Sequence, residues 1–182
     1  MTTAIAITAI CLAGCWEMSI LTPPSAVPES VPVPIVEGGA LAPILLVLPE
    51  CKFMIPEIGF PRSELVSPDL VRLLGADVSA GKAGVPLRLI VDFYREVGDG
   101  QFVLWRKTDR TTENIGSWGN DKVARVFQGA TLPRGRYRVQ ATLVAGNSEM
   151  AKLNPRFYLW STFEKWPTSE NCKAPAYGET GT

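Results

Sequence analysis

The sequence predicts a mainly β protein, an antiparallel β-sandwich of about seven or eight strands with one short inserted helix. Three observations predict this fold class. Apolar and polar side chains alternate from Tyr137 to Leu143, which is the pattern of a strand with one buried face. A second alternating run extends from Leu87 to Tyr94. The turn sequences 97–100 (VGDG) and 133–135 (PRG) lie next to these runs, as expected for strands joined by tight turns.

The chain begins with an apolar, uncharged stretch, residues 1–14, which ends Leu12-Ala13-Gly14 directly before Cys15. The stretch is too short to span a membrane as a helix but suits the core of a secretory signal. Its ending is similar to the lipobox of bacterial lipoproteins, although no Lys or Arg precedes it. We therefore expect residues 1–14 to be a lipoprotein signal peptide and Cys15 to carry the lipid anchor. A buried strand or helix at the start of a cytoplasmic protein is the alternative.

Residues 15–36 are expected to form the lipidated cysteine and a Pro-rich tether. Prolines at positions 23, 24, 28, 32 and 34 favour an extended chain that holds a domain away from the membrane. Alternatively, the end of this stretch, residues 33–36, already pairs with the sheet as an edge. Trp16 stands where an aspartate would resemble an inner-membrane retention signal, so we expect an outer-membrane lipoprotein that faces the periplasm, with display at the cell surface as the alternative. The β-sandwich domain is predicted over residues 37–165 and a polar C-terminal tail over residues 166–182.

Within the domain, the continuous apolar run 40–48 (ALAPILLVL) predicts a strand buried on both faces, with Pro43 favouring an edge or a bulge. Ser67, Pro68 and Asp69 begin a short helix and Gly75 ends it, because they supply an N-cap, a first-turn proline, an acid and a C-terminal stop. Further strands are predicted at 51–55, 87–94, 102–107, 122–128, 131–143 and 156–163.

Four cysteines divide between the leader and the domain. Cys11 would leave with the signal and Cys15 would carry lipid, so Cys51 and Cys172 remain. Two cysteines in an oxidising compartment favour a disulfide, with two free buried thiols as the alternative.

Composition excludes several kinds of site. The net charge is zero, so we expect no nucleic-acid partner. The chain has no histidine, and its Asp, Glu and Cys spacing matches no metal site, so we expect no metal, no cofactor and no enzyme activity. Two weaker enzymatic alternatives remain open. Ser117 acting with Lys122 is one, and a carboxylate-dependent hydrolase using Asp92 and Asp99, or Glu113 and Asp121, is the other.

Binding features are clearer. The polar loop 109–121 carries one large aromatic residue, Trp118, beside Ser117. Arg136 and Arg138, with Arg125 on a neighbouring strand, are expected to form a basic row on an outward sheet face. Alternatively, Trp118 caps the end of the sandwich and the arginines are only solvated. Three further aromatic residues either pack against the helix or line a surface for sugar or lipid: Trp105, Tyr158 and Trp160.

Four segments occur in a particular order: 70–75 (LVRLLG), 84–89 (GVPLRL), 117–119 (SWG) and 132–139 (LPRGRYRV). This order resembles an uncharacterised family of small bacterial lipoproteins that carry a β-sandwich domain of unknown function. The resemblance implies the same fold and setting, and no catalytic residues. We therefore expect a monomeric binding protein, an immunity or inhibitor protein against a secreted envelope toxin or enzyme. A glycan-binding or small-ligand-binding lipoprotein is the alternative.

Overall fold

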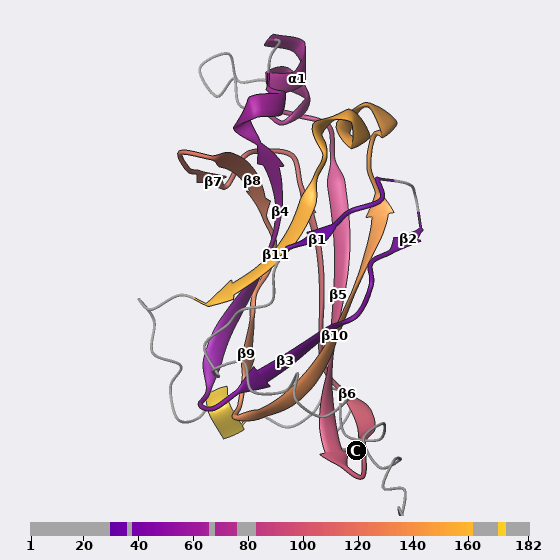
Figure 1. Ribbon diagram of the computed structural model, residues 1–182, viewed down its shortest axis with the longest axis vertical. Coiled ribbons are helices and arrows are strands. Elements are labelled where there is room, and N and C mark those ends of the chain that lie inside the picture. The colour runs from indigo at the N-terminus through magenta and orange to yellow at the C-terminus, as the bar shows by residue number, and fades with distance from the viewer. Residues whose placement is uncertain (1–29, 36–37, 66–67, 76–82, 162–170, 174–182) are drawn as a thin grey trace, which may run out of the picture.

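The computed structural model describes residues 30–35, 38–65, 68–75, 83–161 and 171–173 (Figure 1). Over these residues the chain forms two antiparallel β-sheets packed face to face, so the predicted sandwich is confirmed. The signal peptide, Cys15 and most of the tether and tail lie outside the described residues. No helix within the described ranges is long and apolar enough to cross a membrane.

Sheet A contains six strands in the order β1-β11-β4-β8-β7, and β9 also pairs with β4. Their bounds are β1 (Val31–Pro32), β4 (Lys52–Pro61), β7 (Ser117–Trp118), β8 (Lys122–Val126), β9 (Ala130–Leu132) and β11 (Arg156–Ser161). The edge strand β7 has only two residues, and its hairpin with β8 projects from the side of the sheet (Figure 1). The residues of the β7–β8 hairpin therefore lie at a solvent-facing edge of sheet A.

Sheet B contains five strands in the order β2-β10-β5-β6, and β3 also pairs with β10. Their bounds are β2 (Gly39–Ala40), β3 (Ile44–Leu48), β5 (Leu87–Gly98), β6 (Gln101–Thr112) and β10 (Gly135–Ala145). The hairpin β5–β6 turns at Asp99 and Gly100, both with positive φ, as the VGDG sequence predicts. β10 is the central long strand that the sequence predicts, because β5 pairs along one side of it and β2 and β3 along the other.

Short helices connect the strands. The predicted helix is confirmed as α1 (Pro68–Leu73), which lies at one end of the sandwich together with η1 (Arg62–Glu64) (Figure 1). The segment η3 (Ser148–Leu153) leads into β11, and η4 (Asn171–Lys173) is the last described element.

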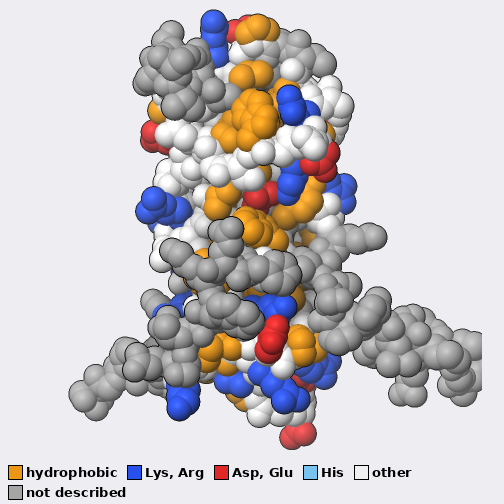
Figure 2. All heavy atoms as spheres, turned by 90° about the vertical axis from the view of Figure 1, so that its left-hand side faces the viewer, with side chains coloured by type: hydrophobic (Ala, Val, Ile, Leu, Met, Phe, Trp, Pro, Cys, Tyr) orange, Lys and Arg blue, Asp and Glu red, His pale blue; other side chains and the backbone are white. Residues whose placement is uncertain are grey.

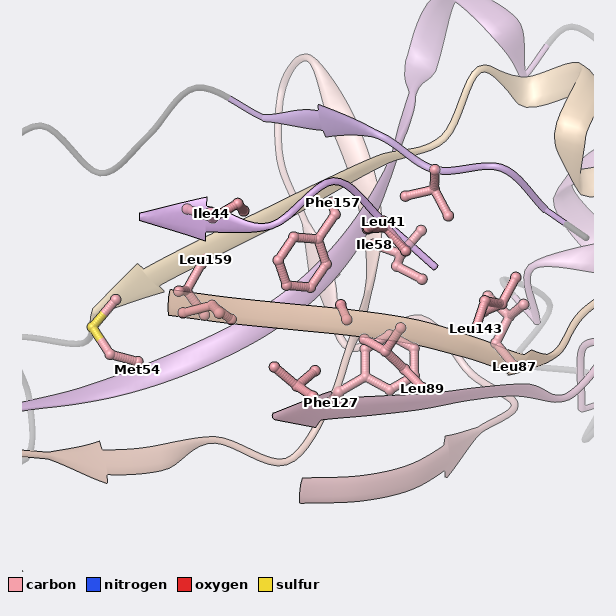
Figure 3. Close-up of a cluster of buried hydrophobic side chains, with 14 of the residues drawn as sticks. Leu41, Ile44, Met54, Ile58, Leu87, Leu89, Phe127, Leu143, Phe157 and Leu159 are labelled. Atoms are coloured by element: carbon pink, nitrogen blue, oxygen red, sulfur yellow. The ribbon is translucent and has the colours of Figure 1, made fainter. Parts of the chain in front are cut away.

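The core fills the space between the two sheets. Ile58 and Phe157 from sheet A and Leu89 and Leu143 from sheet B are almost completely buried and lie in one cluster (Figure 3). Alternation along β10 places Tyr137, Val139, Ala141 and Leu143 in this core, as predicted. Burial of apolar surface by both sheets is what holds the sandwich together.

Two details differ from the prediction. The run 40–48 does not form a strand buried on both faces: along β3 burial alternates, and Leu45 and Val47 are 67% and 55% exposed. The reason is that β3 lies at an edge of sheet B, and alternate side chains of the strand point away from the core. In addition, β1 pairs with β11, and Val33 and Ile35 are buried, so the end of the Pro-rich stretch joins the sandwich and the domain begins before residue 37.

A disulfide and a buried hydrogen bond stabilise the end of the sandwich that lies opposite α1 in Figure 1. A disulfide joins Cys51 and Cys172, as predicted, and ties η4 to the start of β4. The hydroxyl of Tyr137 donates a 2.8 Å hydrogen bond to the carbonyl of Pro133, which fixes the turn between β9 and β10.

Candidate functional site

The β7–β8 hairpin brings the predicted loop residues to the edge of sheet A. Ser117 and Trp118 pair with Ala124 and Val123, and the amide of Gly119 donates to the carbonyl of Lys122, 2.9 Å away. Trp118 is 57% exposed. Trp118 is therefore not a buried cap over the end of the sandwich, because more than half of its surface is accessible.

A cation holds the exposed indole in place. The guanidinium of Arg62 lies 5.5 Å from the centre of the Trp118 ring. Arg62 is itself tied to the hairpin, because its amide donates to the carbonyl of Asp121 and its Nη1 donates to that of Gly119. Arg62 comes from η1, far from Trp118 in sequence, so the fold assembles this pair. A cation over the indole is attractive and leaves the ring edge free for a partner.

A second cation and aromatic pair lies on the outer face of sheet A next to the hairpin. The Lys122 ammonium forms an ion pair with the buried carboxylate of Glu57 and lies 3.6 Å from the centre of the Tyr158 ring. Gly59 makes room for this ring, because a Cβ there would come within 2.7 Å of Tyr158. Trp160, two residues along β11, shares the face of Tyr158 and is 36% exposed.

We call the pair Arg62 and Trp118 and the group Lys122, Tyr158 and Glu57 together the hairpin site. The pair and the group lie on opposite faces of the sheet, because Trp118 is the cross-strand neighbour of the core residue Val123 and Lys122 is the residue before Val123 on β8. On the side of the molecule that carries β7 and β8, hydrophobic side chains lie beside Lys and Arg side chains (Figure 2). Exposed aromatic rings next to cations are typical of binding surfaces.

The structure gives the residues of the enzymatic alternatives the following neighbours. The Lys122 ammonium contacts Glu57 and Tyr158, whereas Ser117 lies beside Ala124 on the edge strand. Asp92 faces Lys107, 3.8 Å away, across strands β5 and β6. Within the described ranges no group of three or more His, Cys, Asp or Glu residues is arranged to hold a metal ion.

The predicted basic row is only partly correct. Arg136 and Arg138 do lie on the outer face of sheet B, on β10. Arg136 forms an ion pair with Glu96 at 3.1 Å, and its side chain is 62% exposed.

Arg125 does not belong to this row, and its prediction as an outward-facing binding residue is wrong. It lies on β8 of sheet A and is completely buried, opposite the core residue Ile58. Its guanidinium donates to the carbonyls of Thr112 at 2.6 Å and Leu73 at 3.0 Å, and burial lowers its pKa to about 10. The residue therefore joins β6 and α1 to sheet A from within.

The five predicted binding residues thus lie in three places: the hairpin edge, the outer face of sheet B and the interior. Two residues of the hairpin site, Arg62 and Glu57, were not predicted from the sequence. No local pattern in the sequence could have identified them, because each is brought to the hairpin by strand pairing over about 60 residues, as in Lys122 with Glu57 at a separation of 65.

The fold is similar to that of a crystal structure of a protein from Sulfurospirillum deleyianum. The TM-score is 0.58 at 14% sequence identity, and the match covers 74% of this chain and 96% of the other chain. At this identity the similarity concerns the fold. No family model matches the sequence, and no curated protein matches it.

Proposed function

We propose that this chain is a lipid-anchored protein of the bacterial cell envelope that acts by binding a protein partner through the hairpin site. The observation that carries the proposal is the exposed indole of Trp118, 57% accessible and held by Arg62 on the projecting hairpin. Tryptophan and arginine are the residues most often found at the energetic centre of protein interfaces. The partner we propose is a secreted toxin or enzyme of the envelope, which binding would occlude.

The location rests on the sequence and is consistent with the disulfide. The lipobox-like ending before Cys15 provides the anchor, and a Cys51–Cys172 bond is of the kind that persists in an oxidising compartment such as the periplasm. Palmitate labelling tests the anchor: wild-type protein should be labelled and the Cys15→Ser variant should not. An unlabelled wild type would refute lipidation.

A competition experiment tests the immunity role. A strain that lacks this gene should be outcompeted on contact by its own parent, and wild-type protein should restore survival. Trp118→Ala should fail to restore it, because the central indole is lost. Trp160→Ala is the matched control, a second exposed tryptophan of sheet A outside the hairpin site, and it should restore survival. Equal survival of the deletion strain and its parent would contradict the immunity role.

Glycan binding is the second candidate, and the pairing of Tyr158 with Trp160 on one sheet face favours it. The indole of Trp160, which is 36% exposed beside the half-buried ring of Tyr158, offers a stacking surface for a sugar ring, and the Lys122 ammonium over Tyr158 offers hydrogen-bond donors. Titration with envelope oligosaccharides, followed by tryptophan fluorescence, separates the candidates. Saturable binding that Trp160→Ala abolishes and Trp118→Ala preserves would favour the glycan function over the protein partner.

A further inference from the structure

The outer face of sheet B, on the opposite side of the core from sheet A, carries a regular set of cross-strand charge pairs. Arg88 binds Asp109 through two hydrogen bonds of 2.9 and 2.7 Å. Lys107 faces Asp92 at 3.8 Å, and Arg136 contacts Glu96 at 3.1 Å. Each of these cations is neutralised by a carboxylate of a neighbouring strand.

Arg138 on the same face is held differently. Its guanidinium lies 5.0 Å from the ring centre of Tyr94 and 5.2 Å from that of Phe102. None of the carboxylates in the described part of the chain forms an ion pair with it, and its buried Nε has no hydrogen-bond partner there. Two rings thus fix the orientation of a guanidinium whose charge is not balanced. Such an arginine is prepared for a carboxylate, which its planar fork binds through two hydrogen bonds.

Exposed apolar side chains border Arg138 on its other side. Leu45 of β3 is the cross-strand neighbour of Arg138, and Val47 is that of Arg136. They are 67% and 55% exposed, and among the described strands β3 pairs only with β10. The segment Ile44–Leu48 contains no charged residue that would protect an exposed edge. Apolar side chains next to an arginine and two aromatic rings match the composition found at the centre of protein–protein interfaces.

We propose that this face is a second protein-binding surface, whose partner places an acidic side chain on Arg138 and covers Leu45 and Val47 with apolar ones. Charge complementarity selects this occupant, because the other three cations are already paired and Arg138 is not. A second copy of the chain paired edge to edge through β3 would cover the apolar residues but leave Arg138 without an acid. The proposal goes beyond the hairpin site, which belongs to the other sheet.

Site-specific photocrosslinking in intact cells tests the proposal. A photoreactive amino acid at Val47 of the full-length protein should form a protein adduct, and mass spectrometry should locate the crosslink within a few residues of an Asp or Glu of the partner. Arg138→Met and Arg138→Gln should lower the adduct yield about tenfold or more, because an interfacial charge pair is lost. Arg138→Lys should also lower it, because an ammonium lacks the planar fork.

The matched control is Arg88→Met, which removes a paired arginine of the same face and should change the yield by less than about twofold. A photoreactive amino acid at the exposed Asn120, in the turn of the β7–β8 hairpin, reports on the hairpin site separately, and its adduct should not depend on Arg138. Four results would each overturn the proposal: an unchanged Val47 adduct in the Arg138 variants, an adduct with a second copy of this chain, an adduct with lipid, or no adduct at Val47. Loss of the Asn120 adduct alone would count against the hairpin site and leave this surface intact.

Discussion

Arg125 and Arg138 show how two arginines on neighbouring stretches of sequence take opposite roles. Arg125 is completely buried in sheet A, where backbone carbonyls of Thr112 and Leu73 accept its hydrogen bonds. Arg138 lies on the outer face of sheet B, where the rings of Tyr94 and Phe102 support it. Neither forms an ion pair with a carboxylate among the described residues. The difference is the group that contacts each guanidinium: two backbone carbonyls accept hydrogen bonds from Arg125, whereas two aromatic rings contact Arg138.

This difference predicts that the region around Arg125 serves folding and the region around Arg138 serves recognition. Arg125 connects three segments at one end of the sandwich, and the fit there is close: a Cβ on Gly84 would lie 2.6 Å from its Nη2. Arg138 connects only the surfaces of β10, β5 and β6, which already pair through their backbones. Substitutions should therefore separate stability from binding.

Removal of the disulfide should give the largest loss of stability, against which the effects of the other substitutions can be compared. Both arginines lie within the loop that Cys51 and Cys172 close, with a sequence separation of 121. Replacing both cysteines by serine should lower the free energy of unfolding by about 4 to 5 kcal/mol, because the unfolded chain regains the entropy of a long loop. Urea unfolding with and without reductant measures this loss. Reduced wild type should match the double variant; equal stability of oxidised and reduced wild type would contradict the prediction.

The next largest effect should separate the two arginines directly. Arg125→Met should lower the free energy of unfolding by about 2 to 3 kcal/mol, because buried carbonyls lose charged donors. Arg138→Met should cost less than about 1 kcal/mol, the usual value of an exposed cation–π contact. Denaturant unfolding of the two variants side by side measures the difference. Equal losses would show that the contrast between the two regions is wrong.

The sequence predicted the sandwich well because alternation is a local signal. The pattern from Tyr137 to Leu143 determines which side of β10 is buried, and VGDG determines the β5–β6 turn. The position of Arg125 was predicted wrongly because alternation separates the two faces of a strand but does not show which sheet contains the strand. It also does not show which face is buried when an arginine occupies one of the core positions. The exposure of Leu45 and Val47 was also predicted wrongly, since a run of apolar residues carries no information about strand order.

The candidate sites were less predictable than the fold for the same reason. Trp118 was found from loop composition alone, whereas Arg62 and Glu57 reach it only through strand pairing. The aromatic support of Arg138 depends on the register of three strands, with Arg138 opposite Tyr94 and Phe102 one strand further. The pairing register of strands far apart in the sequence depends on the hydrophobic pattern of the whole sheet. It therefore cannot be predicted from the residues around Arg138 alone.

Tyr137 sharpens the comparison, because it is the immediate neighbour of Arg138 but faces the core. Tyr137→Phe removes the hydrogen bond to the Pro133 carbonyl and should lower the free energy of unfolding by about 1 kcal/mol at neutral pH. It should leave the photocrosslinking yield at Val47 unchanged, because the outer face is untouched. A stability change accompanied by loss of the adduct would mean that the surface depends on the core of β10.

The same variant has a pH signature. Burial raises the pKa of Tyr137 to about 12 from 10.0, so the folded protein keeps the phenol protonated after the unfolded chain has begun to ionise. The stability that the protonated phenol contributes is fully present below pH 10 and is lost as the pH rises towards 12. Over this range the free energy of unfolding should fall by about 2 to 3 kcal/mol. Wild type should therefore lose stability relative to Tyr137→Phe across this window in paired denaturant titrations. Parallel curves would show that Tyr137 is accessible to hydroxide in the folded protein, and hence that the β9–β10 turn opens.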